Sequence, residues 1–109
     1  MVSIQDIQDY ANKIAERFLP EKIILFGSYA SGQPTEDSDV DLLVIMPFEG
    51  KSHEASTKIR LAVRPPFALD LVVKSPKDVE SHLTDGDMFF RGIFLVGKTL
   101  YEEEHRVVA

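Results

Sequence analysis

The chain has 109 residues, 44% of them hydrophobic and 28% charged, with a net charge of −6 at pH 7 from 12 Lys and Arg against 18 Asp and Glu. This length predicts one domain over residues 1–109, and the acidic balance argues against binding to the phosphate backbone of long nucleic acid. The sequence has no cysteine, no signal-peptide pattern and no apolar run near the roughly 20 residues that cross a membrane, so we expect a cytoplasmic protein without disulfides.

The first half of the chain predicts a helix, a strand, a turn and a second strand. Apolar residues at helical spacing, with Ser3 as a cap, predict a helix over 3–18. A short apolar run predicts a strand over 22–26, a helical turn follows over 28–31, and a polar loop over 33–38 leads to a second strand over 39–46.

The second half of the chain repeats this alternation. It predicts a helix over 51–64, a strand over 67–73, a helix that begins at Ser75 and Pro76, an unusually apolar helix over 87–96 and a short strand over 98–102. These elements predict an α/β fold, in which a small mixed sheet of three or four strands is flanked by helices on one side. In so small a domain, the apolar segment Met88–Val96 is expected to dock a partner or a second copy of the chain.

Two short motifs carry the chemistry. Asp39 and Asp41 point the same way along a strand, with Cα atoms about 6.6 Å apart. Carboxylates placed in this way repel each other unless a cation joins them, and Mg²⁺ commonly binds through one or two carboxylates plus substrate phosphates. Gly27 allows close approach of the backbone, and Ser28 can hold a phosphate. Together they predict a site for a nucleoside triphosphate.

Plainer interpretations of these residues stay open. Either aspartate can shape a turn, Ser28 can be a helix cap, and an acid in the third strand, Asp70, can protect a sheet edge instead of binding a metal. Tyr29 can pack in the core or stack on a nucleobase. The basic residues of the third helix (Lys51, Lys58, Arg60) are expected on a solvated face, and the alternative is that one of them reaches the triphosphate. The three histidines (His53, His82, His105) are expected in solvent.

Gly27-Ser28, Asp39-Val40-Asp41 and the later Asp70, in this order and spacing, resemble the DNA polymerase β-type nucleotidyltransferase superfamily, and the short length is most similar to its minimal nucleotidyltransferase (MNT) branch. The resemblance implies a minimal palm fold, ATP as substrate and two Mg²⁺ ions, with Mn²⁺ as the alternative. It assigns catalysis and metal binding to Asp39, Asp41 and Asp70, and nucleotide binding to Gly27 and Ser28. The MNT pattern often has an Arg where this chain has Ser31.

The same resemblance implies a partner and an activity. MNT proteins are the antitoxin half of HEPN/MNT toxin–antitoxin pairs, so the expected reaction moves AMP from ATP to a hydroxyl of a HEPN toxin. Two alternatives remain: a binding antitoxin with little or no catalysis, and a small-molecule enzyme similar to the aminoglycoside nucleotidyltransferases.

Overall fold

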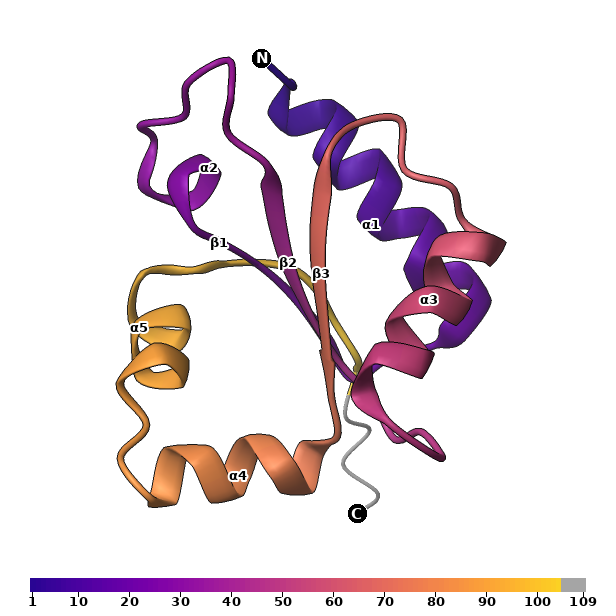
Figure 1. Ribbon diagram of the computed structural model, residues 1–109, viewed down its shortest axis with the longest axis vertical. Coiled ribbons are helices and arrows are strands. Elements are labelled where there is room, and N and C mark those ends of the chain that lie inside the picture. The colour runs from indigo at the N-terminus through magenta and orange to yellow at the C-terminus, as the bar shows by residue number, and fades with distance from the viewer. Residues whose placement is uncertain (105–109) are drawn as a thin grey trace.

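The computed structural model describes residues 1–104 and contains a four-stranded sheet with helices packed on it (Figure 1). Within residues 1–104, no helix has both the length and the apolarity to cross a membrane. In chain order the elements are α1 (Ile4–Phe18), β1 (Lys22–Phe26), α2 (Ser28–Ser31), β2 (Val40–Ile45), α3 (Ser52–Ala62), β3 (Leu69–Lys74), α4 (Pro76–Thr84), α5 (Met88–Val96) and β4 (Lys98–Glu102).

The strand order is β3-β2-β1-β4, so β1 and β2 are central and β3 and β4 form the edges. β1 pairs antiparallel with β2 and with β4, whereas β2 and β3 are parallel. The register places Phe26 opposite Asp41, and Asp41 beside Asp70. Residues far apart in the sequence therefore meet near one end of the three strands.

Helices cover both faces of the sheet, so the prediction of helices on one side is wrong. α1 and α3 pack on one face through residues such as Ile7, Ile14 and Ile59, together with Leu42 and Val44 of β2. α4 and α5 pack on the other face, where the buried residues are Ile24, Phe26, Leu43, Ile45, Val79, Phe90 and Ile93. The reason lies in β1 and β2, whose near-continuous apolar runs present hydrophobic side chains to both faces.

Helix α3 also covers the outer edge of β3. Side chains at every fourth position of α3 donate hydrogen bonds to backbone carbonyls at every second position of β3: Ser52 to Val73, Ser56 to Leu71, and Arg60 to Leu69. These bonds satisfy acceptors that an edge strand would otherwise leave exposed. Arg60 was expected on a solvated face and is instead bound to this edge.

The helix caps largely follow the sequence. The Ser3 and Ser75 hydroxyls accept hydrogen bonds from the backbone N–H groups of Asp6 and Asp78, as the capping patterns predict. Asp87 caps α5.

The histidines divide into three cases. His53 is exposed, as predicted. The prediction for His82 is wrong, because its Nδ1 lies 3.1 Å from an Asp87 carboxylate oxygen and its ring stacks on Phe90 at a centroid distance of 4.3 Å. His105 lies outside the described residues.

Candidate active site

The site begins where β1 ends, at Gly27. Its φ of +73° and ψ of −155° lie in a region that side chains rarely adopt, and its carbonyl accepts the N–H groups of Ala30 and Ser31, each at 3.1 Å. A Cβ atom on Gly27 would stand 2.1 Å from Oδ2 of Asp41. Glycine is therefore required here because the backbone lies directly against the Asp41 carboxylate.

Asp41 lies on the face of the sheet that α4 and α5 cover. Its neighbours Val40 and Leu42 belong to the core under α1 and α3, so the alternation along β2 directs Asp41 to the opposite face. Asp70 occupies the adjacent position of the parallel strand β3. Its side chain therefore projects on the same side, and the structure brings these two carboxylates together.

Asp70 and Asp39 are both exposed, although Asp70 stands between the buried residues Leu69 and Leu71 of β3. Figure 1 explains the exposure of Asp70, because α4 and α5 lie over the other half of this face and leave the first residues of β3 uncovered. Asp39 precedes β2 and does not form part of it. Its charge nevertheless acts on Asp41, as the pKa of that group shows.

The electrostatics of the site converge on Asp41. Partial burial, then the charges of Asp70 and Asp39, and then a hydrogen bond with Asp70 together raise the pKa of Asp41 from 3.8 to about 6. Each cause disfavours the ionised carboxylate. A bound cation would act in the opposite direction, by favouring the ionised form.

The donor set fits Mg²⁺ in its chemistry, since Asp41, Asp70 and Asp39 offer only the hard oxygen ligands that this ion prefers. Within residues 1–104, however, no three side chains of the types His, Cys, Asp and Glu converge closely enough to hold a metal ion by themselves. Mg²⁺ usually keeps several water molecules and shares substrate phosphates, so a site with few protein ligands is compatible with it. The assignment of these residues as metal ligands stays a prediction.

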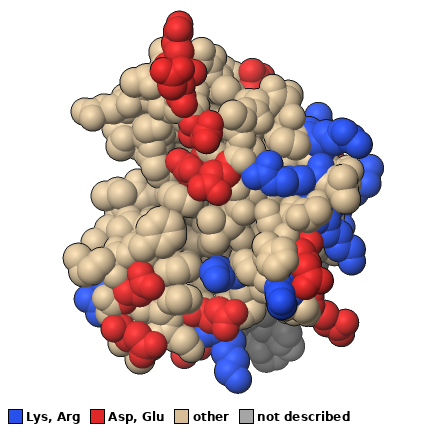
Figure 2. Space-filling model, viewed as in Figure 1, with Lys and Arg blue, Asp and Glu red and all other residues tan. Residues whose placement is uncertain are grey.

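The surface beside these carboxylates is concave. Figure 2 shows the molecule hollowed between the loop after α2 and helix α5, with acidic side chains at the inner end of the hollow. Part of this space is an apolar hollow of about 330 Å³ between the end of β1 and α5, lined by residues that include Phe26, Gly27, Phe89, Gly92 and Val96. The sequence indicated α5 only as a contact surface for another protein and gave no sign that it borders the carboxylates.

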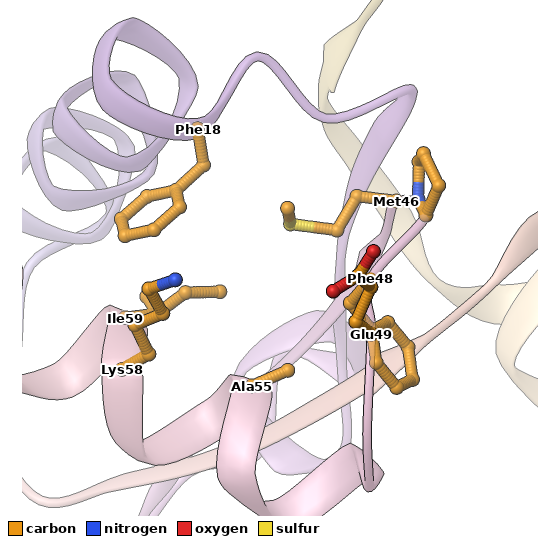
Figure 3. Close-up of a pocket in the computed structure, with 8 residues that line it drawn as sticks. Phe18, Met46, Phe48, Glu49, Ala55, Lys58 and Ile59 are labelled. Atoms are coloured by element: carbon orange, nitrogen blue, oxygen red, sulfur yellow. The ribbon is translucent and has the colours of Figure 1, made fainter.

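A second hollow, of about 310 Å³, lies at the far end of β2, where Phe18, Met46 and Lys58 point into it (Figure 3). Met46 is five residues from Asp41, or about 16 Å along an extended strand. This hollow contains one carboxylate, from Glu49, and its lining residues include no glycine. We therefore place the candidate site at Asp41, and Lys58, which lines the second hollow, lies far from it.

Two residues near the glycine turn have structural roles. Tyr29 is buried and its hydroxyl accepts the backbone N–H of Val2 at 3.0 Å, so packing rather than base stacking is its role. Ser31 donates its hydroxyl hydrogen bond to the carbonyl of Ser28, also at 3.0 Å. Ser28 itself is half-buried and is not the cap of α2, because Gly27 occupies that position. No positive charge is present at position 31, where the MNT pattern often has one.

Comparison with known proteins identifies a family and a relative. The model of the nucleotidyltransferase domain family matches residues 7–105. A candidate protein adenylyltransferase of Methanocaldococcus jannaschii is 44% identical over 41 residues, which are 36% of this chain and 41% of that protein. The match thus spans about two fifths of the length of that curated relative.

Two solved structures share the fold. A candidate nucleotidyltransferase from Sulfolobus solfataricus superposes with a TM-score of 0.56 at 20% identity, over 71% of this chain and 70% of that one. A mutant of the toxin–antitoxin pair MntA-HpeT, with two aspartates changed to glutamate, gives a TM-score of 0.55 at 20% identity, over 89% of this chain and 74% of that one. At this identity the likeness concerns the fold alone.

Proposed function

This chain belongs to the nucleotidyltransferase domain family, and from that premise we propose that it transfers AMP from ATP to a hydroxyl of a partner protein, a HEPN-domain toxin, and so acts as an antitoxin. The observation that carries the proposal is the pairing of Asp41 with Asp70 directly against Gly27. The names of two relatives support the details, since one is a candidate protein adenylyltransferase and another is a toxin–antitoxin pair.

Each site residue has a role in this proposal. Asp41 and Asp39, with Asp70 beside them, would hold Mg²⁺, which when bound neutralises charge on the triphosphate. The Gly27-Ser28 turn would hold the outer phosphates. The acceptor hydroxyl oxygen forms a bond to the α-phosphorus, the bond from that phosphorus to the oxygen bridging to the β-phosphate breaks, and pyrophosphate leaves. Asp70, exposed on the same face, takes the hydroxyl proton or completes the metal site.

The partner would dock on the outer side of α5. Leu95 is 83% exposed, and Phe94 beside it is also exposed, whereas Phe90 and Ile93 are buried in the core. Only part of the segment Met88–Val96 is therefore available to a toxin or to a second copy of this chain. Leu95→Glu should weaken binding of the toxin, or shift a self-association equilibrium in sedimentation, without a loss of fold. Unchanged binding and unchanged oligomeric state would remove this surface from the proposal.

One observation favours a second function, a binding antitoxin without catalysis. Ser31 uses its hydroxyl within its own turn and supplies no cation to balance a triphosphate. A chain of this kind would inhibit its toxin by covering it. The two functions differ in a simple measurement, since only a protein that binds the nucleotide gains thermal stability from Mg²⁺-ATP.

The decisive experiment follows the label of ATP that carries ³²P at the α-phosphate, incubated with Mg²⁺, the chain and the co-expressed toxin. Transfer predicts label on the toxin with the wild-type chain and none with Asp41→Asn. The matched control is Glu49→Gln, which removes a carboxylate from the second hollow and should leave labelling intact. Label on a small molecule in a source-cell extract would favour the aminoglycoside-type alternative, and no labelled product would favour the binding antitoxin.

A further inference from the structure

The apolar hollow beside Gly27 has no role in the reaction as derived above. Phe26 and Gly27 form one wall, and the other wall is a side of α5 where Met88, Gly92 and Val96 recur every four residues, with Phe89 next to them. Phe89 is 54% exposed, yet its ring is fixed by edge contacts with Phe26 at 5.7 Å and Phe90 at 5.5 Å between centroids. A rigid aromatic ring is therefore held open to solvent at the edge of the candidate site.

We propose that this hollow holds the base of the nucleotide whose phosphates lie at Gly27 and Asp41. The inference rests on the proposed function and adds the part of the substrate that the carboxylates and the glycine turn do not contact. Gly27 belongs to both places, since it lies against Asp41 and lines the hollow. Phe26, opposite Asp41 in the sheet, also lines it.

The distribution of charge around the glycine turn favours the hollow beside α5, rather than the loop before β2, as the place of the base. On the other side of the glycine turn, the loop before β2 carries Glu36 and Asp37, which are both exposed and are not proposed metal ligands. That side offers repulsion to a phosphorylated ligand, whereas the hollow offers apolar and aromatic surface. A volume of about 330 Å³ lies at the lower end of the range of small-molecule sites, as a base with part of its ribose requires.

The lining also defines how the base would be recognised. Among the residues of the described chain that line the hollow, none carries a hydrogen-bonding side chain. Every base has a π-face, so recognition by stacking tolerates different bases. The site therefore accepts adenine without excluding guanine or cytosine through side-chain contacts, and ATP, GTP and CTP should bind with affinities within about tenfold of one another.

Gly92 allows a sharp test of the hollow. A Cβ atom built on Gly92 meets no heavy atom of the described chain within 4 Å, apart from its own helix and neighbours. Leucine is also a better helix former than glycine. Gly92→Leu therefore fills the hollow while keeping the fold. Phe89→Ala removes the exposed ring, and Arg91→Leu, at the neighbouring position of α5 outside the hollow, is the matched control.

The experiment compares Mg²⁺-ATP with Mg²⁺-tripolyphosphate by isothermal titration, since tripolyphosphate has the phosphates and no base. Gly92→Leu and Phe89→Ala should each lose at least about fivefold in ATP affinity, the size of a lost base stack, with tripolyphosphate affinity and Arg91→Leu unchanged. Unchanged ATP affinity in both variants, or an equal loss for both ligands, would overturn the inference while leaving the proposed function intact. If the wild-type chain bound neither ligand, the proposed function itself would fail.

Discussion

Replacing Asp41 by asparagine should stabilise the protein at pH 8 while it abolishes the proposed transfer. Folding raises the pKa of Asp41 from 3.8 to about 6, so above pH 6 the ionised carboxylate lowers the free energy of unfolding. Taken without solvent screening, this difference in pKa corresponds to about 3 kcal/mol. Because the side chain is only partly buried, screening by solvent reduces the expected gain to about 1–1.5 kcal/mol. Asparagine is uncharged and avoids this cost.

The direction in which stability changes with pH follows from the unfolded and folded pKa values of Asp41. A carboxyl group with a raised pKa in the folded state contributes most to stability below pH 3.8, and this contribution is lost as the pH rises through about 6. The stability gap between Asp41→Asn and the wild type should therefore be near zero at pH 4, grow between pH 4 and 6, and level off above pH 7. Each kcal/mol of this stability gap should appear as a difference of about 4–8 °C in melting temperature between the variant and the wild type.

The assay is urea and thermal unfolding at pH 4, 6 and 8, with EDTA present to exclude cations. Asp39→Asn is the control, because Asp39 is exposed and should give a smaller gap at pH 8. Adding Mg²⁺ should stabilise the wild type more than Asp41→Asn. A gap that stays constant from pH 4 to 8, or a variant less stable than the wild type at pH 8, would refute this account of the site.

Three further substitutions test the fold around the site. Gly27→Ala should cost about 1–3 kcal/mol in urea unfolding from its backbone conformation alone, and also reduce transfer, because its Cβ displaces the Asp41 carboxylate; full activity would contradict the close approach. Ser56→Ala should cost about 1 kcal/mol, through loss of the 3.0 Å hydrogen bond to the Leu71 carbonyl, and should speed amide exchange in β3. Ser75→Ala should cost about 1 kcal/mol by uncapping α4, with helix content by circular dichroism as the measurement.

The sequence predicted the type and order of the elements because their signals are local. These signals are the apolar periodicity, the Ser3 and Ser75 caps and Pro76 at the start of α4, and each depends on neighbours within a few residues. The glycine turn at Gly27 and the aspartate of β2, Asp41, were also predicted, because they belong to short motifs. The resemblance of these motifs to a nucleotidyltransferase superfamily agrees with the family match over residues 7–105.

The pairing of the strands was not predictable in this way. That β3 lies parallel to β2, with Asp70 beside Asp41, depends on a register between segments about 30 residues apart. The exposure of Asp70 depends on where α4 and α5 end on the sheet, which no local pattern encodes. The two sides of α5 were not predictable either, because its sequence is apolar throughout. The structure places residues such as Phe90 in the core, and another side of the helix lines a hollow.

The hydrogen bonds from α3 to the edge of β3 bear on how accurately the two carboxylates are spaced. If β3 slipped by one residue against β2, Asp70 would turn to the opposite face and the carbonyls of Leu69, Leu71 and Val73 would lose their donors together. The three hydrogen bonds from α3 thus fix the register of β3 against β2, and with it the position of the Asp70 carboxylate relative to the Asp41 carboxylate. Variation in α3 would then change the tolerance of the site for cations of different radius, although none of its residues belongs to that site.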